Sequence, residues 1–259
     1  MPTSSAPWPY PLWFAHRGGG NHAPENTLTA FRCGARHGFE AYECDVKVSA
    51  DDQPFLLHDT TLERTTSGRG VAGNLPWVAL AALDAGRWYG PAHAGEPLPR
   101  LAEVAGHCLQ TGHALNLEIK PTPGTEARTG QLVALAAQQL WAGAVAAGRS
   151  PWPLLSSFDV PALMAAQAAA PALPRALLLD TQWPGWADTA TALGCVAVVL
   201  NHTLVDAALL RTEHGHGRRV LVYTVNEAAR ADTLIAWGID GLITDAIDRL
   251  GPGAAAASA

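Results

Sequence analysis

Cysteine and long apolar runs are both scarce in this sequence, and each scarcity excludes a class of protein. The four cysteines among the 259 residues include no Cys-x-x-Cys pair and are too sparse for a disulfide scaffold, so we expect reduced, buried thiols. The longest uninterrupted aliphatic run, residues 195–200, is far shorter than the roughly 18 residues that a membrane span requires. Residues 1–11 contain no basic residue and lack the charged and apolar regions of a signal peptide, so a cytoplasmic location is expected.

Basic residues are also in the minority. Lysine and arginine together number 17 against 23 aspartates and glutamates, which gives a formal net charge of -6. A nucleic-acid-binding protein would need a basic face, so nucleic acid is not an expected partner. An anionic substrate would have to be bound by local cations.

Apolar side chains, by contrast, are plentiful. They make up 48% of the residues against 15% for charged ones, which is typical of a well-packed globule. The length is close to the roughly 250 residues of one β/α barrel. We predict a single domain over residues 10–250, followed by a disordered tail at 251–259 that contains only Gly, Pro, Ala and Ser.

Short apolar, β-branched runs alternate with longer helical patterns, as in repeated βα units with a parallel sheet. The eight runs are Leu12–His16, Ala41–Val48, Ala114–Ile119, Leu154–Phe158, Ala176–Leu179, Val196–Leu200, Val220–Val225 and Gly241–Thr244. Eight units in a chain of this length favour a closed barrel over an open doubly wound sheet, for which no Gly-x-Gly-x-x-Gly fingerprint is present. The predicted fold class is therefore α/β, a TIM-type (β/α)8 barrel.

The segments between these runs show helical spacing of apolar residues. The first helix is expected from Thr27 to His37, with Asn26 as its N-cap and Gly38 as its left-handed C-terminal residue. An irregular stretch, residues 60–99, is rich in Gly, Pro and Trp and is too long for an ordinary loop. Because it follows the second strand, we expect it to overhang the catalytic face.

Acidic side chains lie near the ends of two predicted strands. Glu43 and Asp45 point to one side of the second strand while Cys44 points to the other, into the core, and Glu118 and Lys120 have the same spacing. Strand ends meet at one rim of a barrel, so three carboxylates and an ammonium converge. Any one acid could form an ordinary salt bridge, but three together favour a hard divalent cation, either Mg²⁺ or Ca²⁺ with Mn²⁺ also open.

Two histidines are expected beside this acidic cluster. His16 ends the first predicted strand and is followed by Arg17, and His58 closes a short extended run, residues 55–57. With Arg17 and Lys120 to hold an anion, the histidines form a candidate general acid and base flanking a phosphoryl group. The other histidines of the chain are expected to be structural or exposed.

These residues resemble the motifs of the glycerophosphodiester phosphodiesterase family. The longer matching stretches are His16-Arg17-Gly18, Pro24-Glu25-Asn26-Thr27, Glu43-Cys44-Asp45-Val46, His58-Asp59-Thr60-Thr61-Leu62-Glu63-Arg64-Thr65-Thr66 and Leu117-Glu118-Ile119-Lys120. Shorter ones are Gly95-Glu96-Pro97-Leu98-Pro99, Ser156-Ser157-Phe158, Tyr223-Thr224-Val225-Asn226 and Asp240-Gly241-Leu242-Ile243-Thr244-Asp245. The resemblance implies a barrel with a small insertion after the second strand, a divalent ion on the three carboxylates, the two histidines as acid and base, and Arg17 and Lys120 as phosphate-neutralising groups.

The sequence departs from the family's pattern at one position, where Tyr223 stands in place of a frequent tryptophan. Either ring can form an apolar wall for glycerol. Phe158 is either a second wall or part of the barrel core. Glu25 belongs either to the cap region of the first helix or to the surroundings of the metal.

The resemblance implies hydrolysis of small glycerophosphodiesters to glycerol 3-phosphate and an alcohol. The nucleophile is either water or the neighbouring hydroxyl of glycerol, and we favour the internal hydroxyl as a hypothesis. A rival is a related barrel phosphodiesterase acting on lysophospholipids or phosphoinositides, which would need an apolar surface on the insertion from residues such as Leu75, Trp77 and Trp88. A non-catalytic binding protein is disfavoured because all the acidic, basic and histidine residues are present. The headgroup and the oligomeric state are left open.

Overall fold

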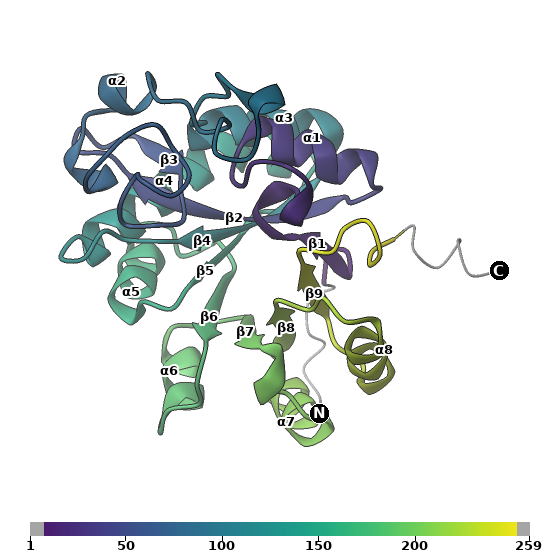
Figure 1. The fold of residues 1–259 in the computed structure, drawn as a ribbon. Helices are drawn as coiled ribbons and strands as arrows, with labels where there is room; N and C mark the ends of the chain where they lie inside the picture. Colours follow the sequence, from purple (N-terminus) through teal and green to yellow (C-terminus); the bar gives the residue numbers. More distant parts are fainter. Residues whose placement is uncertain (1–7, 253–259) are drawn as a thin grey trace.

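A computed structural model describes residues 8–252 and shows a closed barrel of eight parallel strands (Figure 1). The strands are β1 (Trp13–Ala15), β2 (Ala41–Val48), β4 (Ala114–Ile119), β5 (Leu154–Ser157), β6 (Arg175–Leu179), β7 (Ala197–Asn201), β8 (Arg219–Tyr223) and β9 (Gly241–Thr244). Each pairs with the next along the chain, and β1 pairs with both β9 and β2. The predicted fold class is confirmed, and each of the eight predicted runs overlaps one of these strands, with boundaries that differ by at most two residues.

One further strand, β3 (Pro54–Leu56), lies outside the ring and runs antiparallel to β2. β2 is longer than its neighbour β1, which reaches it only at the Ala15–Tyr42 pair. The last three residues of β2 pair with β3 instead. This hairpin extends β2 beyond the barrel and carries the chain directly to His58.

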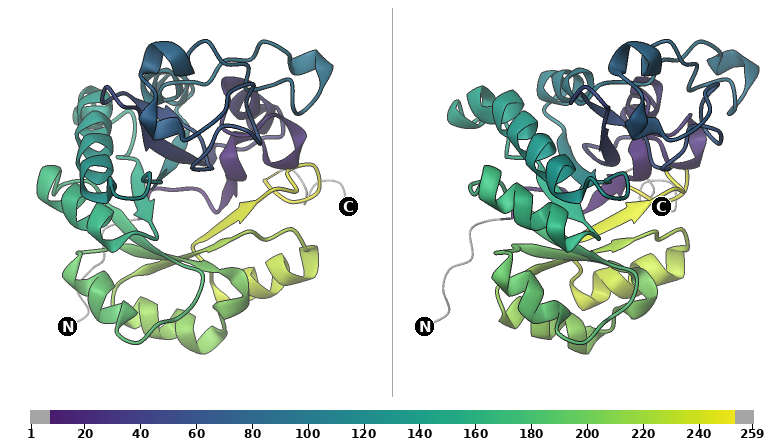
Figure 2. Two further views of the ribbon diagram at one scale, coloured as in Figure 1. Left: turned by 60° about the vertical axis from the view of Figure 1, so that its left-hand side comes forward. Right: turned by 90° about the vertical axis from the view of Figure 1, so that its left-hand side faces the viewer.

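Helices surround the strands on the outside (Figure 2). The α-helices of the described residues are α1 (Leu28–Arg36), α2 (Trp77–Leu80), α3 (Leu101–Thr111), α4 (Glu126–Ala146), α5 (Val160–Ala169), α6 (Trp186–Ala192), α7 (Ala207–Gly215) and α8 (Ala228–Trp237). Short 3-10 helices are η1 (His16–Gly18), η2 (Gly20–His22), η3 (Ala72–Asn74), η4 (Pro91–His93) and η5 (His202–Leu204). The apolar layer between strands and helices includes Cys44, which points outward as predicted. All four cysteines are buried and unpaired, which confirms the expected thiols.

The interior of the barrel has an apolar floor. Phe14, Ala41, Ala114, Leu154 and Ile243 belong to one buried cluster contributed by the strands. Because side chains alternate along a strand, the inward positions that follow Ala41 and Ala114 are those of the predicted acidic residues. The polar site is therefore stacked directly on the floor, toward the C-terminal ends of the strands.

The first helix begins one residue later than predicted, and its N-cap is Thr27, whose side chain accepts a hydrogen bond from the backbone N–H of Ala30. The prediction of Asn26 as the cap is wrong. Asn26 adopts a left-handed φ of 58°, which asparagine tolerates better than most residues, and its side chain turns instead to Asp45. Gly38 has the expected left-handed φ of 84°.

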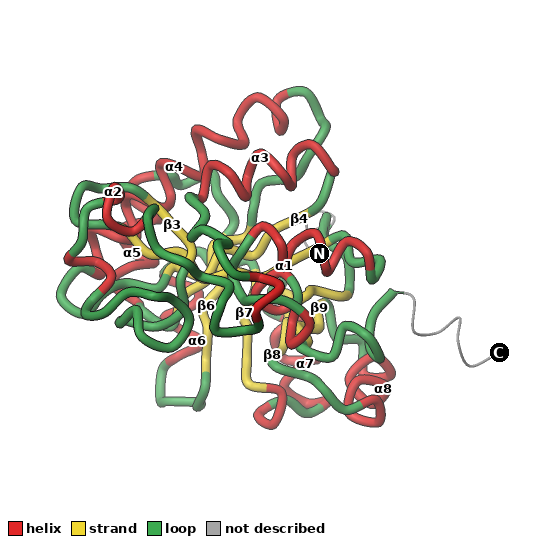
Figure 3. The backbone as a smooth tube through the Cα atoms, turned by 45° about the horizontal axis from the view of Figure 1, so that its top comes forward, coloured by secondary structure: helices red, strands yellow, loops and turns green. Residues whose placement is uncertain are grey.

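The insertion, which we define as residues 57–100, has a small apolar core of its own. Leu57, Leu62, Leu80 and Leu98 are buried in it, with Trp77 packed against them. Figure 3 shows this segment mostly as loops beside α1 rather than as regular structure. Only His58 of this segment lines the catalytic cavity, so the predicted overhang is limited to its first residues. Its later part contacts α1 and η2, where Glu96 accepts two hydrogen bonds from Thr29 and Tyr89 donates to the carbonyl of Asn21. Residues 75–77 contact the turn between β2 and β3 instead.

The end of the domain also differs from the prediction. Gly251, the first residue of the predicted disordered tail, is buried beside the ring of Phe39 and so is part of the folded domain. Pro252 is also described and is exposed, and residues 253–259 of that tail lie outside the described residues. Among the residues described, no helix combines the length and the apolar character needed to cross a bilayer.

Candidate active site

A cavity of about 220 Å³ opens at the C-terminal ends of the barrel strands. All the predicted site residues except Asp45 line it, and Asp45 adjoins it in the acidic cluster described below. The full lining is His16, Arg17, Glu43, His58, Asn116, Glu118, Lys120, Phe158, Leu178, Tyr223, Thr224 and Ile243. Residues from η1, β2, β4, β8 and the start of the insertion thus meet at one rim, as the strand pattern predicts.

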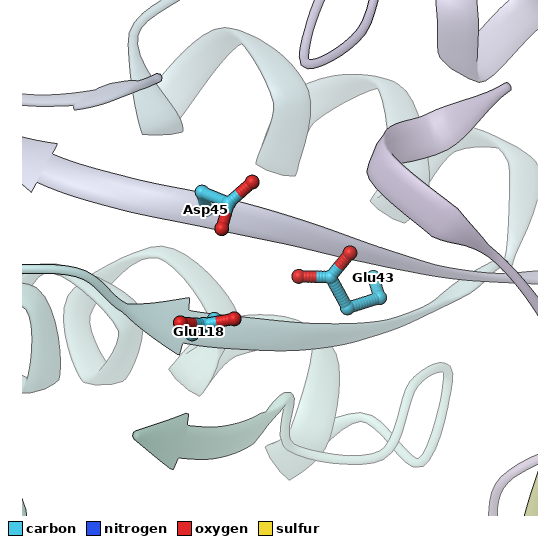
Figure 4. A group of neighbouring side chains, drawn as sticks. All are labelled: Glu43, Asp45 and Glu118. Carbon is cyan, nitrogen blue, oxygen red and sulfur yellow. The ribbon is translucent and has the colours of Figure 1, made fainter. Parts of the chain in front are cut away.

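Three buried carboxylates form the centre of the site, and Figure 4 shows Glu43 and Asp45 on β2 facing Glu118 on the neighbouring β4. One oxygen from each lies within 4.8 Å of the others. Their arrangement follows from the register, because Asp45 pairs with Glu118 across the two parallel strands. The Oε1 atom of Glu43 is buried and has no hydrogen-bond partner among the described residues.

The three carboxylates of this cluster repel one another, and this repulsion and their burial shift their pKa values. Burial and then repulsion by Asp45 raise the pKa of Glu43 to about 8. Burial and Asp45 also raise the pKa of Glu118. Burial would raise the pKa of Asp45 as well, but Arg17 and Lys120 hold it below its usual range. Closely spaced oxygen donors, one of them without a partner, fit a hard divalent cation, which would neutralise the repulsion.

Each candidate catalytic histidine is paired with an aspartate. The Nδ1 atom of His16 lies 2.6 Å from Oδ1 of Asp245, and the Nδ1 atom of His58 lies 2.7 Å from Oδ1 of Asp59. Such pairs fix the orientation and tautomer of the ring and leave Nε2 for chemistry. In His16, Nε2 lies 3.7 Å from Oε2 of Glu43, at the edge of the acidic cluster.

The two histidines nevertheless have different surroundings. Burial lowers the pKa of His16, but the hydrogen bond to Asp245 and the charge of Glu43 outweigh it, so the net pKa is raised. Burial lowers the pKa of His58, and the positive charges of Arg17 and Lys120 lower it further against the opposing effect of Asp45. The cavity therefore has two imidazoles of unequal basicity.

Two cations accompany the carboxylates. Arg17 has a left-handed φ of 49°, and its backbone N–H donates to Glu43. The Nζ atom of Lys120 lies 2.6 Å from Glu118 and 3.5 Å from Asp45. Both cations border the cavity, where they can balance a phosphate as well as the acidic cluster.

Phe158 and Tyr223 form the apolar side of the cavity. Their rings meet edge to face with centroids 5.8 Å apart, and Lys120 lies over the ring of Phe158. The side chain of Phe158 is 41% exposed, so its alternative placement in the barrel core is wrong. The Tyr223 hydroxyl donates to the backbone carbonyl of Leu179, which holds the ring upright at the rim.

Several polar residues around the site were not anticipated. Asp245 ends one of the family-like stretches, but its role could not be predicted because its partner His16 is 229 positions away. Asn226 donates to Asp245 and accepts from its backbone N–H, which fixes that carboxylate in turn. Asn116 was missed as well: its Oδ1 accepts from Ser156, while its buried Nδ2 has no partner within residues 8–252. Side chains alternate along β4, so Asn116, two residues before Glu118, points to the same inward side. This alternation could have identified it.

The sequence profile of the glycerophosphoryl diester phosphodiesterase family matches residues 16–249. The chain belongs to this family. A relative in Bacillus subtilis (strain 168), YhdW, is 30% identical over 240 residues, covering 89% of this chain and 93% of its own, and its name assigns it provisionally to the same activity. A protein of Caldanaerobacter subterraneus named glycerophosphodiester phosphodiesterase is 28% identical, covering 90% of this chain and 93% of its own.

Solved structures of the family share the fold. An Oleispira antarctica phosphodiesterase, determined in complex with its product sn-glycerol-3-phosphate, has a TM-score of 0.82 and 31% identity, with 93% of this chain and 95% of that one covered. A glycerophosphodiester phosphodiesterase of Agrobacterium tumefaciens has a TM-score of 0.75 at 23% identity, with 92% and 97% covered. These matches confirm the predicted family resemblance, the barrel fold and the enzyme class.

Proposed function

We propose that the chain hydrolyses soluble glycerophosphodiesters to glycerol 3-phosphate and an alcohol, with one divalent cation and with His16 and His58 as general acid and base. The observation that carries this proposal is a single cavity bordered by three carboxylates, two aspartate-oriented histidines and two cations. The product complex of the Oleispira relative supports glycerol 3-phosphate as the product here.

The carboxylates Glu43, Asp45 and Glu118 would hold the cation, which we propose to be Mg²⁺ or Ca²⁺, with Mn²⁺ also suitable. When bound, the cation supplies positive charge to the phosphoryl oxygens and lowers the pKa of a coordinated hydroxyl or water. Glu43 keeps one oxygen on the backbone N–H of Arg17, which leaves the buried Oε1 free to bind the ion. Asp45 is fixed by Asn26, whose side chain both donates to it and accepts from its backbone.

The phosphate would lie between Arg17 and Lys120, and the glycerol would lie against Phe158 and Tyr223. The two perpendicular rings together offer an apolar surface for the carbon backbone of glycerol. The two histidines would act through Nε2, because Nδ1 of each is turned to a carboxylate. We retain attack by the neighbouring hydroxyl as the preferred route, in which one histidine removes its proton and the other protonates the leaving alkoxide. The histidines then exchange these tasks as water opens the cyclic phosphate.

The rival activity on lysophospholipids has less support from the surface of the insertion. Leu75 and Trp77 pack on the insertion's own core rather than facing outward, and Arg100 lies over the Trp77 ring. Trp88 is 41% exposed, but its indole N–H is held by the carbonyl of Ala85. A cavity of about 220 Å³ suits a small headgroup diester better than an acyl chain. A cytoplasmic location remains a prediction.

A product assay tests the proposal. The protein is incubated with glycerophosphoglycerol, glycerophosphoethanolamine, glycerophosphocholine and micellar lysophosphatidylcholine, with and without added Mg²⁺ or Ca²⁺. Glycerol 3-phosphate is measured as the product of the soluble diesters, and lysophosphatidic acid is measured as the product of the micellar lipid. We expect release from the soluble diesters only with metal. Faster turnover of the micellar lipid would favour the rival, and equal turnover under excess chelator would contradict the metal-dependent mechanism.

A further inference from the structure

Arg64, at the start of the insertion, uses both edges of its guanidinium to hold two carboxylates at once. Its Nε and Nη2 atoms donate to the two oxygens of Asp59 at 2.6 and 2.9 Å. Its Nη1 and Nη2 atoms donate to the two oxygens of Glu25 at 2.8 Å each. A guanidinium that makes two bidentate contacts fixes direction as well as charge, which an ammonium cannot do.

The first of these carboxylates, Asp59, connects Arg64 to His58. Asp59 follows His58 in the chain, and its Oδ1 accepts both from Arg64 and from the imidazole Nδ1. The Asp59 side chain is partly exposed, so without Arg64 it could turn to solvent. Arg64 therefore determines where the partner of the imidazole sits, and through it which ring nitrogen faces the cavity.

The second carboxylate, Glu25, connects Arg64 to Arg17. Oε1 of Glu25 accepts from Arg64 and from Nη1 of Arg17, both at 2.8 Å. On its other side, the Nε atom of Arg17 lies 3.3 Å from Asp45. The guanidinium of Arg17 is thus held between Glu25 and the acidic cluster, and the position of Glu25 depends on Arg64.

Stability alone is a weak explanation for this arrangement. The Arg64 side chain is 44% exposed, and ion pairs at such sites contribute little to folding. Arg64 does not border the cavity. It does join two chain segments, the start of the insertion and the loop that precedes α1, and each of them connects to a residue that lines the cavity, His58 in one case and Arg17 in the other.

We propose that Arg64 is a positioning residue that orients His58 through Asp59 and Arg17 through Glu25, and so aligns the acid–base group with the phosphate-binding group. This inference rests on the proposed function for its kinetic tests. It assigns no contact with the substrate to Arg64. It does assign a purpose to Glu25, which the sequence left open.

Kinetics of Arg64→Ala and Arg64→Lys test the proposal against a matched control. Arg87, in the same insertion, forms a single exposed salt bridge with Asp84 and has no link to the site, so Arg87→Ala controls for the loss of a surface arginine. We expect Arg64→Ala to lower kcat/KM on the order of 10²-fold, as for a catalytic group displaced by about 1 Å. Arg64→Lys should restore little of the lost kcat/KM, because a single ammonium cannot fix the orientation of both carboxylates. Wild-type kinetics in Arg64→Lys would overturn the proposal.

Two double-mutant cycles separate positioning from a general structural role. Asp59→Asn should lower mainly kcat, and Glu25→Gln should raise mainly KM. In the Asp59→Asn background, the further effect of Arg64→Ala on kcat should largely vanish, and in the Glu25→Gln background its effect on KM should vanish. Full, additive losses in both backgrounds would show that Arg64 acts by another path and would overturn the proposal.

A measurement without substrate keeps this inference distinct from the proposed function. The ¹⁵N signals of the His58 ring, identified by their loss in His58→Gln, report which nitrogen carries the proton. At pH 8 we expect a proton on Nδ1 in the wild type and in Arg87→Ala, and a mixture of tautomers in Arg64→Ala. An unchanged tautomer in Arg64→Ala would overturn the inference even if diesters are cleaved. The expected change with no turnover of any diester would overturn only the proposed function.

Discussion

Replacement of Gly20 by alanine should disable the site while leaving the barrel folded. Gly20 has a left-handed φ of 53°, and the backbone N–H of the next residue, Asn21, donates to the carbonyl oxygen of Asp245. A Cβ atom on Gly20 would lie 2.2 Å from that oxygen and 2.8 Å from the Cα of Asp245. Neither atom is the end of a flexible side chain, so the backbone on one side must move.

The size of the movement gives the expected effect. Restoring an ordinary contact requires a displacement of about 1 Å, and a misplacement of that order near reacting groups costs on the order of 10²-fold in rate. Whichever side yields, the 2.6 Å bond between His16 and Asp245 is disturbed. The clash and the left-handed backbone together should cost roughly 2 to 4 kcal/mol of unfolding free energy.

Gly38→Ala is the matched control. Gly38 is also left-handed, with a φ of 84°, but an added Cβ would meet no atom within 4 Å. It should lose roughly 1 kcal/mol from backbone strain alone, a fall of a few degrees in Tm, and keep its kcat. The assay compares kcat at saturating metal and substrate with Tm for both variants. If Gly20→Ala kept kcat within about twofold of the wild type, the claim that Asp245 positions His16 would be refuted.

The remaining predictions concern the metal, the histidines and the nucleophile. Chelation should abolish turnover and a hard divalent ion should restore it, while Glu118→Gln should weaken ion binding in calorimetry; full activity in excess chelator would exclude the metal. His16→Ala and His58→Ala should each lose on the order of 10²- to 10⁴-fold in kcat with unchanged circular dichroism, and near wild-type turnover would make that histidine structural. A diester whose vicinal hydroxyl is removed or methylated should bind as an inhibitor but hardly react. Its cleavage at a rate comparable to the natural diester would favour direct attack by water.

The strands and the acidic cluster could be predicted because their causes are local. Alternation along a strand places Glu43 and Asp45 on one face, and parallel pairing places Glu118 beside them. The apolar runs give the strand order because consecutive βα units are neighbours in a barrel. These features depend only on the spacing of residues within the sequence, so they can be predicted without the structure.

What the sequence could not supply is pairing between distant segments. The capping preference of asparagine pointed to Asn26, yet a tertiary hydrogen bond to Asp45 outweighed it and the adjacent Thr27 took the cap. Asp245 likewise has a role only because the barrel closes and brings it to His16. Phe158 extends past the end of β5 into the cavity rather than into the core, and a strand boundary of this kind is uncertain from sequence by a few residues.

Barrel closure also determines when this chain can become active. His16 follows the first strand and Asp245 follows the last, and the two meet only where β1 pairs with β9. On the ribosome, a nascent chain that still lacks β9 can carry every carboxylate of the acidic cluster and both histidines, yet one histidine has no partner to orient it. Phosphodiesterase activity should therefore appear late in synthesis, when the final strand docks, and it can serve as a reporter of complete folding.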